Sequence, residues 1–175
     1  MKKIAMFFGF LFMLQMAYSQ QDIFEIARKG TVAELKNELK ENPNRINSVN
    51  NEGYNLITLA TYRQNNEVAA YLIQNGAEIN GKSNYGSPLM AAVVKGNSEI
   101  AKMLIDAGAD LNITDGSGNT ALIYATIFKK YDIAEMLVKA SADINFKDIR
   151  GKSAVDYAKM TNDEKLLQLF KKDKL

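Results

Sequence analysis

A five-residue tail recurs three times along this chain at almost constant spacing. The copies read Gly-Ala-Glu-Ile-Asn, Gly-Ala-Asp-Leu-Asn and Ser-Ala-Asp-Ile-Asn, and they end at Asn80, Asn112 and Asn145. Other columns keep the same period, and one of them consists of alanines: Ala60, Ala92, Ala125 and Ala158. A fixed period of roughly 20 to 50 residues is typical of repeat proteins whose units stack in a row.

Each unit is predicted to hold two short amphipathic helices followed by a turn. Apolar residues recur three and four positions apart, as at Ile100, Met103 and Leu104. The first helices are expected over 56–63, 88–95, 121–128 and 154–160. The second helices are expected over 66–74, 98–106, 131–139 and 163–172. Gly76 and Gly108 follow two of the second helices, where a left-handed residue ends a helix at little cost.

Three segments resemble the ankyrin repeat family. Residues 87–92 read Ser-Pro-Leu-Met-Ala-Ala and residues 120–125 read Thr-Ala-Leu-Ile-Tyr-Ala, which is similar to the family's Thr-Pro-Leu-His-x-Ala signature. Residues 96–100 read Gly-Asn-Ser-Glu-Ile and resemble its Gly-His-x-Glu-Ile/Val segment. The resemblance covers roughly residues 22–172. It implies an all-α ankyrin solenoid of helix-turn-helix units with finger turns, which recognises protein partners through a concave surface of fingers and first helices.

About five units are expected. They are an N-terminal cap over 22–49, internal repeats over 50–81, 82–114 and 115–147, and a C-terminal cap over 148–175. In the first unit the polar residues Glu34 and Asn37 stand where Val68 and Tyr71 stand in the second. Polar residues at those positions suit an outer face that has no neighbouring unit.

One column tests the alignment of the units. Lys129 stands where Gly30 and Gly96 stand in other units. If this column requires a positive φ, a lysine there costs about 1 kcal/mol relative to glycine, and Lys129→Gly should stabilise the chain.

The first 19 residues have the pattern of a cleaved signal peptide. Lys2 and Lys3 precede an apolar run over 4–14, and Ala17 and Ser19 form a small-x-small cleavage site before Gln20. The apolar run is shorter than the roughly 20 residues that cross a bilayer. A leader on a chain without cysteine favours a bacterial periplasmic or secreted protein. An uncleaved leader that tethers the chain to a membrane as a structural stalk is the alternative.

Charge and composition exclude several classes of function. Removal of the leader takes away Lys2 and Lys3 and leaves 20 basic and 20 acidic residues. A neutral chain has no electrostatic preference for nucleic acid or for an anionic membrane surface, so we expect neither partner. The chain contains no cysteine and no histidine, which excludes Cys/His zinc sites and thiol or Ser-His catalysis. We therefore expect no catalytic, cofactor-binding or metal-binding residues. We also expect the protein to be a monomer.

Two short motifs match known sites by their letters alone. Residues 76–83 fit the Gly-x4-Gly-Lys-Ser pattern of a phosphate loop, but a helix is expected before them where that loop needs a strand. Residues 115–119 read Asp-Gly-Ser-Gly-Asn, as at the start of a calcium loop. Such a loop requires Gly at its sixth position and Glu at its twelfth, where this chain has Thr120 and Thr126. A finger turn in which glycine adopts a positive φ is the better interpretation of the second motif.

A binding surface is predicted where units of this kind present exposed side chains, at the fingers and at the ends of the first helices. Apolar residues at such positions should form one stripe along the stack and mark an interface. The predicted partner-binding residues are Tyr54, Tyr62, Arg63, Val94, Lys95, Asn119, Ile127, Phe128, Ile149 and Arg150. The competing interpretation is that Ile127 and Phe128 fill a local gap in the fourth unit.

These observations favour a non-enzymatic protein-binding module that is exported to the periplasm or beyond. Besides the tethered stalk, a carboxylate-based enzyme remains an alternative. Such an enzyme would need two acids flanking a cleft, whereas most acids here fall at solvent positions on helices or in turns.

Overall fold

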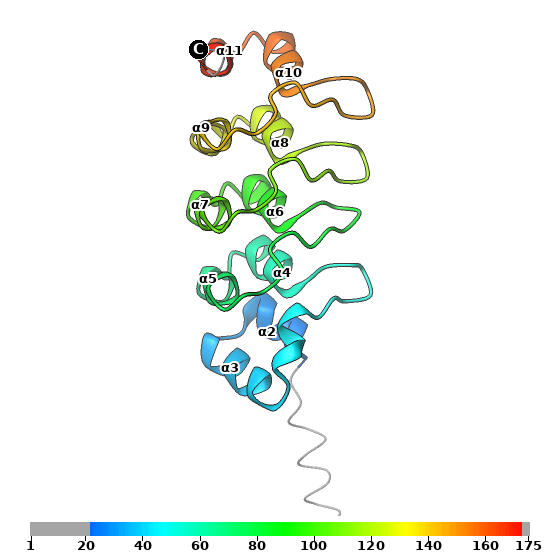
Figure 1. The fold of residues 1–175 in the computed structure, drawn as a ribbon, viewed down its shortest axis with the longest axis vertical. Coiled ribbons are helices and arrows are strands. Elements are labelled where there is room, and N and C mark those ends of the chain that lie inside the picture. The colour runs from blue at the N-terminus through cyan, green and yellow to red at the C-terminus, as the bar shows by residue number, and fades with distance from the viewer. Residues whose placement is uncertain (1–21, 173–175) are drawn as a thin grey trace, which may run out of the picture.

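The computed structural model describes residues 22–172 and shows a stack of helix pairs (Figure 1). The predicted leader and its cleavage site lie outside the described residues. The first unit consists of α2 (Ile23–Lys29), α3 (Val32–Glu41) and a 3-10 helix, η1 (Pro43–Asn47). The following units are α4 (Leu56–Tyr62) with α5 (Asn66–Gln74), α6 (Pro88–Lys95) with α7 (Ser98–Asp106), α8 (Ala121–Ile127) with α9 (Tyr131–Lys139), and α10 (Ala154–Met160) with α11 (Glu164–Lys172).

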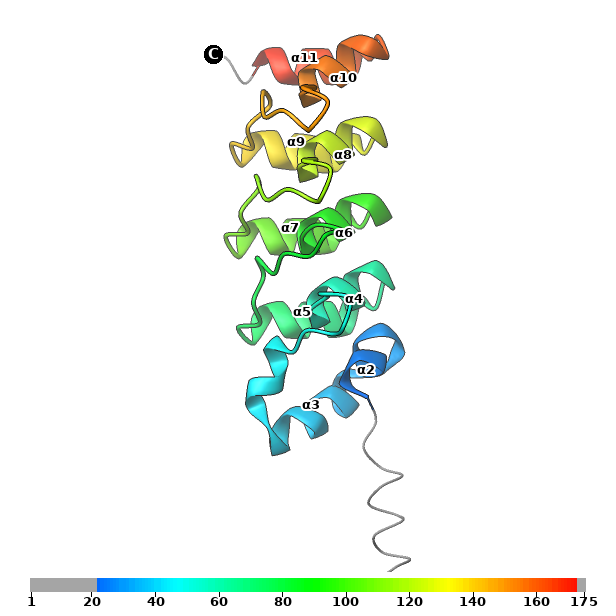
Figure 2. The same ribbon diagram turned by 90° about the vertical axis from the view of Figure 1, so that its right-hand side faces the viewer.

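The predicted fold class, an all-α repeat solenoid, is confirmed. The first helices stack in one row and the second helices in another, while finger loops extend beyond the first row (Figures 1 and 2). Five of the eight predicted helices have the expected bounds. The other three differ by one residue, because Arg63 and Phe128 cap α4 and α8, and Asp163 precedes α11 with its side chain accepting the Leu166 N–H. None of the helices in the described residues is long and apolar enough to cross a membrane.

The core lies between the stacked units. The alanine column is completely buried, which lets neighbouring first helices approach closely. The second helices contribute a parallel column of buried branched residues: Val68, Ile100, Ile133 and Leu166. Helices of neighbouring units contact one another in both rows, and these side chains belong to one continuous core, so no unit can bury its apolar surface by itself.

Each first helix begins with the same device. The side chain of Asn55 accepts a hydrogen bond from the Thr58 N–H, and Ser87, Thr120 and Ser153 act in the same way in the later units. Such caps satisfy a backbone donor that has no partner inside the helix. The cap residues therefore fix where each finger ends and its helix begins.

The recurring Asn of the tail links neighbouring units. Oδ1 of Asn80 accepts the Asp110 N–H at 2.9 Å, and Oδ1 of Asn112 accepts the Asp143 N–H at 3.2 Å. Asn47 makes the equivalent bond to the Glu78 N–H at 2.8 Å. This ladder explains why the sequence repeats Asn at that position.

The turn between the two helices of a unit is left-handed in four units. The φ angles are 60° at Gln64, 66° at Gly96, 52° at Lys129 and 49° at Asn162. The expectation of a positive φ is thus right for Gly96 and Lys129. It is wrong for Gly30, whose φ is −82°. Glycine is needed at residue 30 for a different reason, since a Cβ there would lie 2.8 Å from the Cα of Ile26.

Candidate functional site

Four finger turns begin at Asn50, Ser83, Asp115 and Asp148, and in all but the Ser83 finger a carboxylate or amide oxygen holds the turn. Oδ1 of Asp115 accepts the N–H groups of Ser117 and Asn119 at 2.8 and 2.9 Å. Asp148 holds the last finger and Asn50 the first in the same manner. An oxygen that accepts two backbone N–H groups folds the finger tightly without help from a partner.

The finger of the third unit is one residue shorter than the others. It closes with hydrogen bonds between Ser83 and Gly86, whereas the next finger closes between Asp115 and Asn119. This shorter turn lies in the shorter of the two intervals between the recurring tails. It places Tyr85 where its ring stacks on that of Tyr54, with centroids 5.4 Å apart and planes inclined by 23°.

The last two units fill the corner between finger and first helix with a tyrosine. The Tyr124 hydroxyl donates to Oδ2 of Asp115 at 2.5 Å, and the Tyr157 hydroxyl donates to Oδ2 of Asp148 at 2.6 Å. Leu59 and Ala91 hold the same helix position in the second and third units, as the alignment of the repeats shows. No tyrosine hydroxyl reaches the finger from that position there, and the corner stays open.

These hydrogen bonds set the charge state of the finger acids. Burial would raise the pKa of Asp115, but hydrogen bonds from Tyr124, Asn119 and Ser117 together lower it below its ordinary value. Burial and the bond to Asp115 raise the pKa of Tyr124 to about 12. The pKa of Asp148 is also lowered, because the bonds from Tyr157, Lys152 and Arg150 outweigh its burial. Both carboxylates are therefore ionised acceptors and poor proton donors at neutral pH.

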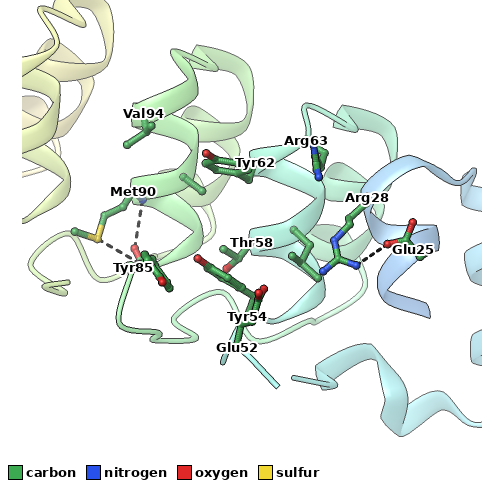
Figure 3. A pocket seen from close by; sticks show the side chains of 13 residues that line it. Glu25, Arg28, Glu52, Tyr54, Thr58, Tyr62, Arg63, Tyr85, Met90 and Val94 are labelled. Atoms are coloured by element: carbon green, nitrogen blue, oxygen red, sulfur yellow. Dashed lines mark hydrogen bonds and ion pairs between the residues drawn. The ribbon is translucent and has the colours of Figure 1, made fainter. Parts of the chain in front are cut away.

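A first groove, the N-terminal groove, opens where the corner is unfilled (Figure 3). It has a volume of about 580 Å³ and crosses the first three units. Figure 3 shows Arg28 and Arg63 on the side of α2 and α4, and Tyr85 and Met90 on the side of α6. Its walls are formed by Glu25, Arg28, Glu52, Tyr54, Thr58, Leu59, Tyr62, Arg63, Tyr85, Ser87, Met90, Ala91 and Val94.

A second groove, the C-terminal groove, lies over the fourth and fifth units. It has a volume of about 420 Å³ and includes the Tyr157–Asp148 pair and the Tyr124 ring. Phe128 stacks on that ring, with centroids 5.6 Å apart and planes inclined by 1°. Its walls are formed by Ser117, Asn119, Tyr124, Thr126, Ile127, Asp148, Arg150, Tyr157 and Thr161.

An apolar column runs along the C-terminal ends of four first helices. Its members occupy equivalent positions at the repeat period and are all exposed: Tyr62 at 51%, Val94 at 36%, Ile127 at 40% and Met160 at 65%. Lys95 lies over the Tyr62 ring, with Nζ 4.4 Å from the ring centroid. Exposed apolar side chains that recur in register are unusual on a surface that has no partner.

The structure places most of the predicted site residues at these features. The N-terminal groove is lined by Tyr54, Tyr62, Arg63 and Val94. Lys95 does not line it, but its Nζ lies over the ring of Tyr62, which does. Asn119, Ile127 and Arg150 line the C-terminal groove, and Phe128, 46% exposed, stacks on one of its walls.

The expectation of one continuous stripe is wrong at two residues. Tyr54 is half-buried under Tyr85 rather than exposed. Ile149 is 75% exposed but sits at a finger tip and lines neither groove. Its backbone N–H donates to the carbonyl of Ser117, so the tip is tied to the previous finger.

Sequence reasoning missed Met160, Tyr85 and the two tyrosines that bond the finger acids. Met160 could have been found, because it continues the column of Tyr62, Val94 and Ile127 at the same period. Tyr124 and Tyr157 also share a column, as do Asp115 and Asp148. The position of Tyr85 depends on the short finger and carries no repeat signal.

The motifs that resemble a phosphate loop and a calcium loop both form structural parts of the repeat. Gly76 follows the C-cap of α5 with a φ of 79°, and the Ser83 hydroxyl bonds to Gly86 within a finger. Asp115 is likewise occupied by its own finger and Tyr124. Within residues 22–172 no group of three or more carboxylates is arranged to hold a metal ion.

Comparison with family models gives two adjoining matches. A model described as ankyrin repeats in three copies matches residues 23–115, and a single ankyrin repeat model matches residues 117–149. No curated protein sequence shows a significant match to the chain.

Proposed function

From the fact that this chain belongs to the ankyrin repeat family, whose repeats are protein–protein interaction modules, we propose that it binds a partner protein through the face that carries its fingers and first helices. The observation that carries this proposal is the exposed apolar column of Tyr62, Val94, Ile127 and Met160. Four units keep an apolar residue in register at a solvent position, although the core does not need it.

The ordered backbone of the fingers supports a binding role. Each finger is closed by its own hydrogen bonds, and neighbouring fingers are joined, as where the Gly116 N–H donates to the Asn84 carbonyl at 2.9 Å. A surface that is already ordered loses little conformational entropy when a partner binds. The stack thus presents the grooves and the apolar column in one fixed arrangement.

The acids of the last two fingers support a binding role over a catalytic one. A carboxylate pair that hydrolyses a glycosidic bond needs one member with a raised pKa to act as the acid. Asp115 and Asp148 instead have lowered pKa values and accept bonds from their own fingers. We propose that the protein is not an enzyme and works as a monomeric adaptor of five units, with the boundaries stated above.

The leader motivates the proposal of export to the periplasm or the extracellular space of a bacterium. Its pattern lies in residues outside the described part of the chain, so the proposal rests on the sequence alone. The intact mass of the exported protein tests it. A mass equal to that of residues 20–175 supports cleavage before Gln20, and a mass that includes residues 1–19 contradicts it.

The binding face is tested by capturing partners from the host's envelope and medium with matched variants. Val94→Ser combined with Ile127→Ser removes the centre of the apolar column, while Gln74→Ser alters an exposed residue at the end of a second helix. We expect partners retained by the unaltered chain and by Gln74→Ser to be lost from the double variant. Equal recovery on all three proteins would contradict the proposed face.

A further inference from the structure

The N-terminal groove has an uneven distribution of charge. Arg28 and Lys29 end α2, Arg63 caps α4 and Lys95 ends α6, so cations gather at the helix ends beside the groove, and Arg28 and Arg63 line it. The negative end of each helix dipole tolerates a cation there without an acidic partner. In the fourth and fifth units the position of Arg63 and Lys95 is held by Phe128 and Thr161, which are uncharged.

One carboxylate serves this group of cations. Glu25 accepts Arg28 at 2.7 Å and Lys29 at 3.0 Å, so its charge is already shared between two partners. Among the described residues, Arg63 and Lys95 form no ion pair. Lys95 contacts the Tyr62 ring instead, which neutralises none of its charge. The helix-end side of the groove is therefore net positive.

The middle of the same groove is apolar and aromatic. Tyr62 and Val94 are exposed beside the Met90 and Leu59 walls, and the Tyr54–Tyr85 stack closes the finger side. Glu52 belongs to the same finger as Tyr54 and lies away from Arg63 (Figure 3). A ligand with a negative group at the helix-end side and an apolar group in the middle would match both features, while a second negative group near Glu52 would be repelled.

We propose that the N-terminal groove binds an acidic peptide segment of a partner protein, in which one or more carboxylates lie next to a large apolar side chain. The carboxylates meet Arg63 and Lys95, and the apolar side chain lies against Tyr62, Val94 and Met90. This inference rests on the proposed protein-binding function and names the chemistry of its partner. The proposed function itself does not depend on the charge of the partner.

Polyanions fit the groove less well than an acidic peptide. A nucleic acid or an anionic membrane needs a broad basic surface, and basic and acidic residues balance over the chain outside the leader. The cations here are confined to the helix ends beside a groove that also carries Glu52. This confinement favours a short acidic segment.

The test selects random twelve-residue peptides on the purified protein and measures the affinity of the selected peptides. We expect them to be enriched in Asp and Glu next to a large apolar residue. Arg63→Glu should weaken their binding at least about tenfold, because it turns an attraction into a repulsion. Lys40→Glu is the matched control, since Lys40 is an exposed cation in the last turn of α3, in the opposite helix row.

Salt concentration gives a second readout that does not depend on any variant. The affinity of the selected peptides should fall as salt rises from about 0.05 M to about 0.5 M. The inference is overturned if the selected peptides are neutral or basic, if no acidic peptide is selected, or if Arg63→Glu leaves binding unchanged. It is also overturned if a single-stranded oligonucleotide or a vesicle of anionic lipid binds in an Arg63-dependent way and the acidic peptides do not.

The same experiment separates the two proposals. Selected peptides that lose affinity with Val94→Ser but carry no acidic bias would leave the protein-binding face intact and remove only the acidic partner. Acidic peptides that respond to neither Val94→Ser nor Arg63→Glu would contradict both.

Discussion

The side-chain amide of Asn55 occupies the space where a side chain on Gly81 would lie. Asn55 is buried, and its Nδ2 donates to the Glu78 carbonyl at 2.8 Å while its Oδ1 caps α4. The three later units use the shorter Ser or Thr at this cap and need no glycine opposite. A methyl group on residue 81 would overlap Nδ2 of Asn55, so the two residues are matched in size.

This match predicts a strongly non-additive pair of substitutions. Gly81→Ala should destabilise the chain by about 1–3 kcal/mol, because both ends of the Asn55 amide are held by hydrogen bonds. Asn55→Ser should cost about 1 kcal/mol through the lost bond to Glu78. When Asn55 is replaced by Ser, the methyl group of an alanine at residue 81 has room. The double variant Asn55→Ser/Gly81→Ala should therefore be no less stable than Asn55→Ser alone. Urea unfolding measures the cycle, and additive costs would contradict the steric match.

The sequence predicted the architecture well because the repeat imposes it. Helix bounds, the buried alanine column and the left-handed turn at Lys129 all follow from a period that the letters show directly. The prediction was wrong for Gly30, because the backbone there is extended and glycine is required by the close approach of Ile26 instead. Glycine satisfies both a positive φ and a close approach, and the letters cannot distinguish the two.

The grooves were harder to predict because they depend on departures from the repeat. A single missing residue in the third finger brings Tyr85 onto Tyr54, and Ala91 leaves open the corner that Tyr124 fills in the next unit. Column averages hide such differences. The apolar column, which does keep the period, was predicted for three of its four members.

The left-handed turn predicts which substitutions by glycine stabilise the chain. Gln64→Gly should raise the free energy of unfolding by about 1 kcal/mol, since a side chain is strained at a φ of 60°. Lys129→Gly should gain less, because Nζ of Lys129 lies 3.4 Å from the buried carboxylate of Asp163 and that ion pair would be lost. Denaturant midpoints at unchanged m-value compare the two. A larger gain for Lys129→Gly would mean that the ion pair contributes nothing.

A buried hydroxyl in α4 predicts a second stabilising substitution. Oγ1 of Thr61 is fully buried and has no hydrogen-bond partner. Thr61→Val should stabilise the chain by about 1 kcal/mol, and Val93 already holds the equivalent position in the next unit. Thr126→Val is the control and should give no gain, because the Thr126 hydroxyl donates to the Leu122 carbonyl at 2.9 Å. Thermal unfolding decides, and a loss of stability in Thr61→Val would contradict the assignment.

The Tyr124–Asp115 pair predicts a dependence of stability on pH. Because the pKa of Asp115 is lower in the folded chain than in the unfolded one, its contribution is present above the unfolded pKa of about 3.9. That contribution is lost as the pH falls through the lower, folded pKa. Tyr124→Phe should cost about 1–2 kcal/mol at neutral pH and progressively less in that acid range. Tyr71→Phe serves as control, and a cost for Tyr124→Phe that is independent of pH would contradict the charged bond.

The last prediction concerns Phe128, for which a binding role and a core role differ in cost. Phe128 is 46% exposed and packs on one side against Tyr124, so Phe128→Ala should lower the free energy of unfolding by about 1 kcal/mol. Phe170→Ala is the matched control, because Phe170 is 3% exposed and its removal should cost about 3–5 kcal/mol. Tyr62→Ala should behave like Phe128→Ala and, in partner capture, both should weaken binding by about 2 kcal/mol. If Phe128→Ala costs as much stability as Phe170→Ala, then Phe128 fills the fourth unit's core and the binding face loses that residue.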